Sequence, residues 1–171
     1  MMNTLEAISK SSSHREYQDT PLTEDQLKVL LEAGLYAPSS ENEQPWYLVG
    51  ILNKEKVEQL DKDIQAIHQD TKAHFFHAPA AILVAVNKTA KTPIVDAATC
   101  TQNILLAAED LNLAACWVDG ILAINNSDKF EHYKKEFNLP DGYEFQTSIA
   151  LGHRVNTPSR GPRKGQYIIV K

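Results

Sequence analysis

The sequence predicts an α+β fold, a sandwich of helices and strands, from two observations. Segments with helical spacing of apolar residues are mixed along the chain with short apolar runs of strand length. Residues 94–111 are apolar around most of their circumference, which is typical of a central helix that packs on several sides. These patterns favour an α+β sandwich over a doubly wound sheet.

The first half of the chain is expected to form helices over residues 3–10, 23–36 and 53–69 and a strand over residues 46–51. Thr23 can cap the second helix, and Gln26 three residues later completes a capping box. Pro38 ends that helix, and Pro45 holds Gln44 extended. The stretch between the two prolines is therefore expected to be a stiff loop that presents short polar side chains.

The second half is expected to form strands over residues 80–86, 114–118, 143–151 and 166–170 and helices over residues 94–111 and 128–137. The first of these strands has no polar alternation, so both of its faces should be buried. Asn112 follows the central helix, where a C-cap tolerates left-handed geometry. An irregular basic segment, residues 157–165, precedes the terminal strand.

Length and charge limit the class of protein. A chain of 171 residues suits one domain, residues 1–171, since domains usually hold about 100–200 residues. The net charge is −5 and the chain has no basic block, so nucleic acid is not an expected partner. No apolar run reaches the ~18 residues of a membrane span. The N-terminus lacks the order of a signal peptide, so we expect no membrane association and a cytoplasmic location.

Reactive side chains show no arrangement of their own that would support catalysis. Cys100 and Cys116 lie in apolar runs and are expected to be buried free thiols. The six histidines have no ligand spacing with cysteine, so no metal is expected. Asp61 and Asp63 are expected on the exposed face of a charged helix. The glycine spacing matches neither a Rossmann dinucleotide site nor a P-loop. We therefore assign no catalytic acid, base or nucleophile.

The polar loop has a distinctive sequence. Residues 37–46 read APSSENEQPW, with two prolines, two hydroxyls, two side-chain amides and a Trp. By itself such a stretch is also typical of an ordinary helix-to-strand connector. The pattern APSSxNxQPW resembles the signature loop of the nitroreductase family of FMN-dependent oxidoreductases. Further motifs of that family occur along the chain in the family's order. Before the loop they are Ser13, Arg15 and Tyr17, and after it they are His77-Ala78-Pro79, Gln102-Asn103, Cys116-Trp117-Val118-Asp119-Gly120 and Ile149-Ala150-Leu151-Gly152.

The resemblance covers nearly the whole chain and implies both fold and activity. It implies a central, mostly antiparallel sheet flanked by helices, with the C-terminal strand exchanged to a partner subunit. NAD(P)H would reduce FMN, leave, and be replaced on the same ring face by a nitroaromatic, a quinone or a similar small oxidant. In a homodimer, the loop matching residues 38–42 would come from one subunit, whereas Arg15, Gly120 and Arg163 would come from the other.

The same resemblance implies a set of cofactor-binding residues. They are Ser11, Ser12, Ser13, Arg15, Pro38, Ser39, Ser40, Asn42, Val118, Asp119, Gly120, Arg163 and Lys164. The FMN phosphate needs cations and hydroxyl or backbone donors. Arg15, Arg163 and Lys164 would supply the charge, with Arg160 as a rival in the tail. For each of these cations the alternative interpretation is a solvated surface side chain.

Two site motifs keep an alternative interpretation. Asp119-Gly120 would direct a backbone N–H at the flavin, and a glycine lets the backbone approach the ring. The same pair could be an ordinary turn at a strand end. Asn42 would hydrogen-bond the pyrimidine edge of the ring, or it could form an Asx-turn within its own loop.

A further charge near the flavin has weaker support. Thr71 and His74 fall near positions where some longer members of the family carry Asn and Lys facing the flavin. His74 or Lys72 could supply that charge, although a polar helix end predicts the same residues.

One departure from the family supports a second functional hypothesis. Ser11 and Ser12 stand where family members usually carry two adjacent basic residues. Their absence removes up to two charge-assisted bonds, each contributing roughly 1.5–3 kcal/mol. The alternative is therefore a flavin-poor or non-catalytic ligand-binding relative of the same fold.

Overall fold

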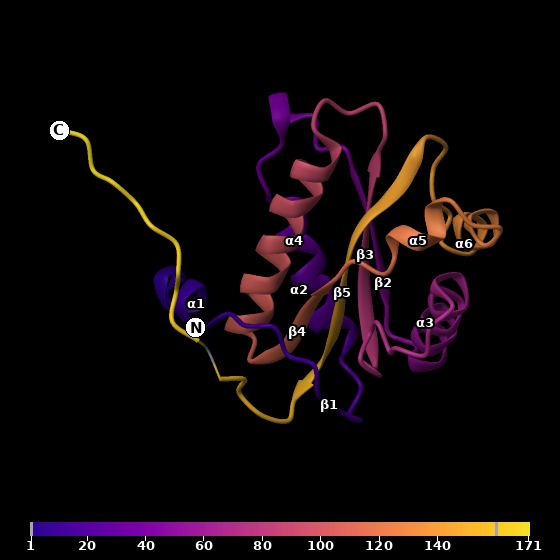
Figure 1. The fold of residues 1–171 in the computed structure, drawn as a ribbon, viewed down its shortest axis with the longest axis horizontal. Helices are drawn as coiled ribbons and strands as arrows, with labels where there is room; N and C mark the ends of the chain where they lie inside the picture. The colour runs from indigo at the N-terminus through magenta and orange to yellow at the C-terminus, as the bar shows by residue number, and fades with distance from the viewer. Residues whose placement is uncertain (1, 160) are drawn as a thin grey trace.

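A computed structural model of the chain describes residues 2–159 and 161–171. Within these residues one five-stranded sheet separates two layers of helices (Figure 1). The elements are α1 (Thr4–Lys10), β1 (Tyr17–Gln18), α2 (Glu24–Leu35), η1 (Ser40–Asn42), β2 (Trp46–Ile51), α3 (Lys54–His68), β3 (Ala80–Asn87), α4 (Pro93–Asp110), β4 (Leu113–Val118), α5 (Leu122–Asn125), α6 (Phe130–Glu136) and β5 (Tyr143–Arg154).

The sheet is antiparallel at every pairing. Strand β5 is its common member, because β3, β4 and β1 all pair with it, and β2 pairs with the far edge of β3. The predicted central antiparallel sheet flanked by helices is confirmed. The predicted sequence boundaries of β2, β3, β4 and α4 agree with the structure to within one residue.

Two apolar cores lie on the two faces of the sheet. Helices α2 and α4 cover one face, and α3, α5 and α6 cover the other (Figure 1). Consecutive residues of β3 enter opposite cores, as Ile82 and Leu83 do, so the strand is buried on both faces as predicted. Gly34 lets α2 approach α4 closely, since a Cβ there would lie 3.0 Å from both Cys100 Sγ and Ile104 Cδ1.

Several local predictions are confirmed. Thr23 and Gln26 form the predicted capping box at the start of α2. Asn112 adopts left-handed geometry with φ of 55°. Both cysteines are buried free thiols, and burial raises the pKa of Cys100 to about 12.

The prediction for Asp61 and Asp63 is wrong, because both side chains are buried. Asp61 Oδ1 accepts a hydrogen bond from the backbone N–H of His74 at 2.9 Å. Asp63 Oδ2 accepts one from the Tyr133 hydroxyl at 2.7 Å, and Lys129 Nζ lies 3.1 Å from its Oδ1. The partners come from distant segments that fold over this face of α3, which its own periodicity does not reveal.

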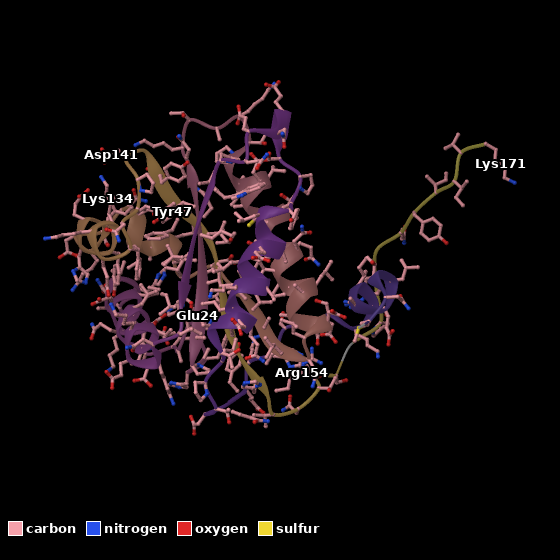
Figure 2. All side chains as sticks on the ribbon, turned by 180° about the vertical axis from the view of Figure 1, so that it is seen from behind. Glu24, Tyr47, Lys134, Asp141, Arg154 and Lys171 are labelled. Carbon is pink, nitrogen blue, oxygen red and sulfur yellow. The ribbon has the colours of Figure 1, made fainter. Side chains whose placement is uncertain are left out.

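The prediction of a terminal strand is wrong for the single chain. Residues 166–170 form no strand in the part of the chain that the structure describes, and their side chains are exposed. The tail runs away from the body past α1 and carries Lys171 far from the sheet (Figures 1 and 2). A strand needs a hydrogen-bonded neighbour, and this chain places none beside the tail. Exchange of this segment with a partner subunit stays a prediction.

Three short elements were not predicted from the sequence. Strand β1 has two residues, α5 has four and η1 has three, which is too short for a period to be detected.

Among residues 2–159 and 161–171, no helix is both long and apolar enough to cross a membrane. The same residues contain no group of three or more His, Cys, Asp or Glu side chains placed to hold a metal ion.

Candidate functional site

Two adjoining hollows lie beside β4. The first, of about 530 Å³, is lined by residues from the α1–β1 segment, α4, β4 and the tail. The second, of about 230 Å³, is lined by residues from the same segment, the α3–β3 connection and the end of β4. Arg15 and Trp117 line both hollows, so the two form one continuous site.

The first hollow combines hydroxyls with cations. Ser11, Ser12 and Ser13 line it together with Arg15 and Arg163. Its volume lies within the range of about 300–1,000 Å³ that is usual for small-ligand sites. Three hydroxyls and two guanidinium groups are donors, and that donor set suits a phosphate group.

The α1–β1 segment is held against β4 by its backbone. The N–H of Ser11 donates to the carbonyl of Ala7 at 2.8 Å, and the N–H of His14 donates to the carbonyl of Ala115 at 2.9 Å. The Tyr17 hydroxyl donates to the His14 carbonyl at 2.7 Å. His14 is buried, whereas its neighbours in sequence, Ser13 and Arg15, are exposed. The segment therefore turns the predicted donors outward, into the site.

Arg15 is supported by an aromatic ring. Its guanidinium carbon lies 5.5 Å from the centroid of the Phe76 ring, a cation–π arrangement. None of the carboxylates in residues 2–159 and 161–171 forms an ion pair with Arg15. Its charge is therefore available to a ligand.

Cys116 lies behind the same donors. Burial raises the pKa of its thiol, while the nearby charge of Arg15 and a hydrogen bond from Ser13 oppose that rise. The thiol therefore stays protonated near neutral pH and is no nucleophile.

The end of β4 shapes the second hollow. The Val118 carbonyl accepts a hydrogen bond from the Ser148 hydroxyl at 2.7 Å. The Trp117 indole N–H donates to Asp119 Oδ1 at 2.8 Å. A Cβ at Gly120 would meet the ring Nδ1 and the Cβ of His74 at 3.1 Å, so this position fits glycine best.

His74 also lines the second hollow, together with Lys72. Its backbone N–H donates to Asp61, and its ring Nε2 lies 3.3 Å from Asp70 Oδ1. Its ring stacks on His68 with 5.1 Å between centroids. The predicted pair of Lys72 and His74 thus lies beside Gly120, whereas Thr71 does not line either of the two hollows.

The polar loop lies elsewhere, on the N-terminal half of α4. The N–H of Ser40 donates to Asp96 Oδ1 at 3.0 Å, and the Thr99 hydroxyl donates to the Pro38 carbonyl at 2.8 Å. Within the loop, Gln44 donates from its backbone to Ser39 Oγ at 2.9 Å and from its amide to Asn42 Oδ1 at 3.0 Å. The loop lines neither hollow, so one chain does not bring Pro38, Ser39, Ser40 and Asn42 together with the other predicted residues.

The tail contributes one of the three predicted cations. Arg163 lines the first hollow, whereas Lys164 is exposed and lines neither hollow. Arg160 lies outside the described residues. Sequence reasoning missed Phe76 and treated Trp117 only as part of a motif. Nothing in the local pattern signals that Phe76 stacks under Arg15, because the two residues lie on separate segments.

The comparisons with known proteins show the family and the fold. The model of the nitroreductase family matches residues 8–153. A Methanothermobacter thermautotrophicus protein, described as a candidate NADH dehydrogenase/NAD(P)H nitroreductase, is 32% identical over 161 residues, covering 92% of this chain and 80% of its own. A Vibrio harveyi NADPH-flavin oxidoreductase is 28% identical, covering 99% of this chain and 73% of its own.

A solved structure shows the same fold. A nitroreductase with bound FMN from Desulfitobacterium hafniense matches with a TM-score of 0.87 and 29% identity, covering 99% of this chain and 100% of its own. The family model covers most of the chain, and the fold and the order of motifs agree with it. The chain belongs to the nitroreductase family.

Proposed function

We propose that this chain is an NAD(P)H-dependent FMN oxidoreductase that reduces nitroaromatics, quinones or a similar small oxidant, acting as one FMN-binding domain over residues 1–171. One observation carries the proposal: Arg15 lines both a hollow with hydroxyls and Arg163 and a hollow that Gly120 also lines. Family membership and the FMN-bound neighbour support the same cofactor.

The residues present fit FMN. Ser11, Ser12, Ser13 and Arg163 would hold its phosphate, with Arg15 between phosphate and ring. Gly120 lines the second hollow and has no side chain of its own to keep a flat ring from the backbone, while His74 packs where its Cβ would be. When bound, FMN accepts a hydride from NAD(P)H and passes electrons to the oxidant. The chain itself then binds, orients and shields the reacting groups.

The flavin ring would lie beside positively charged side chains in the second hollow. Arg15 and Lys72 bring positive charge to it, and His74 adds an imidazole ring. Positive charge beside a flavin favours electron uptake, so these side chains tune the cofactor rather than act as acid or base.

We further propose that the enzyme is a homodimer with two shared sites. The loop of residues 38–42 lies on α4 away from both hollows, so a second chain would have to supply it to the site. The exposed Tyr167, Ile168, Ile169 and Val170 support the exchange of the tail, since such a segment is rarely left without a neighbour.

The test is FMN binding followed by turnover. Purified protein soaked in FMN and desalted should keep flavin absorbance at one FMN per chain. Initial rates with menadione at several fixed NAD(P)H concentrations should give parallel lines, because both substrates would use one ring face in turn. Intersecting lines would show that both substrates bind together and would exclude the shared-face scheme.

The flavin-poor relative remains the second candidate, and one observation favours it. Ser11 and Ser12 line the first hollow where the family usually has two cations, so its positive charge comes from Arg15 and Arg163. Protein that carries no flavin after soaking, yet is folded, would decide for this candidate.

A further inference from the structure

The second hollow contains a carboxylate close to the cations that a ligand would need. Arg15, Lys72 and His74 line this hollow, and so does Asp119. Arg15 and Asp119 are both exposed and line this hollow together with Cys116, and their charges shift the pKa of the Cys116 thiol in opposite directions. Opposite charges that line one hollow attract each other, although solvent keeps exposed pairs of this kind weak.

The pair nevertheless does not form in this structure. Asp119 Oδ1 accepts the indole N–H of Trp117 at 2.8 Å, and the Arg15 guanidinium lies over the Phe76 ring. Each charge therefore has a neighbour that competes with the ion pair. Trp117 lines both hollows, so this residue lies where the two parts of the site meet.

We propose that Trp117 is a positioning residue that holds the Asp119 carboxylate away from Arg15 and so keeps Arg15 available to an anionic ligand. Without the indole N–H, Asp119 would be free to turn towards Arg15 and compete with the ligand for its charge. This inference rests on the proposed FMN function, because FMN is the anion that Arg15 would meet.

The test is a double-mutant cycle read by FMN binding. The quenching of FMN's own fluorescence reports affinity in the wild type, Trp117→Phe, Asp119→Asn and the double variant. Phe keeps an aromatic ring on the strand but has no N–H, and Asn keeps the size of Asp without its charge. Trp117→Phe should weaken FMN binding about three- to fivefold, the range expected of one exposed ion pair. On the Asp119→Asn background the same change should matter less than about twofold.

Salt and a second aromatic donor provide controls. The loss in Trp117→Phe should shrink at high salt, because salt screens the competing pair of Arg15 and Asp119. Tyr47→Phe removes the hydroxyl that donates to the Phe137 carbonyl, at a residue outside the signature loop that lines neither hollow, and it should leave FMN affinity at the wild-type value. An equal loss from Trp117→Phe on both backgrounds, or no loss at all, would overturn the proposal.

A measurement on the unliganded protein covers the case in which the Trp117 variant does not fold. In ¹⁵N-labelled wild type, the Trp117 indole N–H should exchange with solvent more slowly than in Asp119→Ala. Equal exchange would show that the bond does not hold Asp119, and would overturn the proposal. If wild type binds no FMN, the proposed function fails, and this exchange measurement still decides whether the bond exists.

Discussion

Arg154 donates from Nη2 to Glu109 Oε2 at 2.6 Å and thereby ties the last residue of β5 to the last turn of α4. Its Nε also donates to the Leu113 carbonyl at 2.9 Å. The two side chains are only 15% and 5% exposed. Figure 2 places Arg154 near the point where the tail leaves the body, so this pair anchors the end of β5 there.

Removing Arg154 should destabilise the fold strongly. Arg154→Met leaves the Glu109 carboxylate buried without a partner, which typically costs about 3–5 kcal/mol. Urea unfolding at one protein concentration measures the change. Lys28→Met is the matched control, because the exposed pair of Lys28 and Glu24 has side chains 59% and 74% exposed. Loss of this exposed pair should lower the free energy of unfolding by less than about 0.5 kcal/mol. A loss of similar size in both variants would contradict the structural role of the buried pair.

Stability should depend on Asp63 in the acid range. Burial raises the pKa of this carboxyl, but hydrogen bonds from Tyr133 and Lys129 outweigh it and leave the pKa below its usual value. A lowered pKa in the folded state stabilises the fold fully above the unfolded value of about 3.9, and the contribution is lost as pH falls through the folded pKa. Asp63→Asn should therefore cost about 1–3 kcal/mol at pH 6, and the difference from wild type should shrink as the pH falls below about 4.

Urea unfolding at several pH values measures this difference. Asp141→Asn is the control, since Asp141 pairs with Lys134 at a position where its side chain is 96% exposed. That variant should follow the wild-type curve closely, because solvent screens the pair. A difference between wild type and Asp63→Asn that stays constant from pH 6 to pH 3 would contradict the assignment of a charged Asp63.

FMN affinity should respond to a cation restored at position 12. Ser12 is half-buried in the first hollow, so Ser12→Arg adds a charge-assisted donor there and should tighten FMN binding about tenfold. Affinity should fall with added salt, and more steeply in this variant. Fluorescence titration measures both effects. Ser9→Arg adds the same charge to α1 outside this hollow, and equal tightening by that variant would point to a general effect of charge.

The fold followed from the sequence where local pattern determines structure. The capping box of Thr23 and Gln26, the two-face burial of β3 and the bend at Asn112 each depend on residues close together in the chain. Asp61 and Asp63 show the limit, because their burial depends on partners 13 and 70 residues away. The prediction of a strand over residues 166–170 was wrong for the single chain for a related reason, since a strand forms only beside another strand.

The site was predicted as a set of residue types rather than as an arrangement. Arg15, Gly120 and the serines came from motifs, and the structure gathers them around two hollows. The stacking of Arg15 on Phe76 and the bond from Trp117 to Asp119 could not be predicted, because each depends on side-chain placement. The cytoplasmic location and the exchanged strand stay predictions.

Two inactive variants should restore activity when mixed, if each site takes residues from two chains. Asn42→Asp changes the loop on α4, where φ of 58° suits Asn and Asp alike. Gly120→Val forces a side chain against His74 in the second hollow. In a heterodimer one site collects both changes and the other is intact. Unfolding and co-refolding an equal mixture should therefore restore about a quarter of wild-type sites, measured by NAD(P)H oxidation with menadione.

The control for this experiment is a pair of changes in the same half of the site. Arg15→Glu and Gly120→Val lie in one chain's hollow, so every site of their heterodimer carries one change and activity should not return. Pull-down with two different tags confirms that heterodimers have formed in both mixtures. If the mixture of Asn42→Asp and Gly120→Val recovers no more than this control, each site lies within one chain. The loop on α4 would then be an ordinary connector, since in a single chain it lines neither hollow.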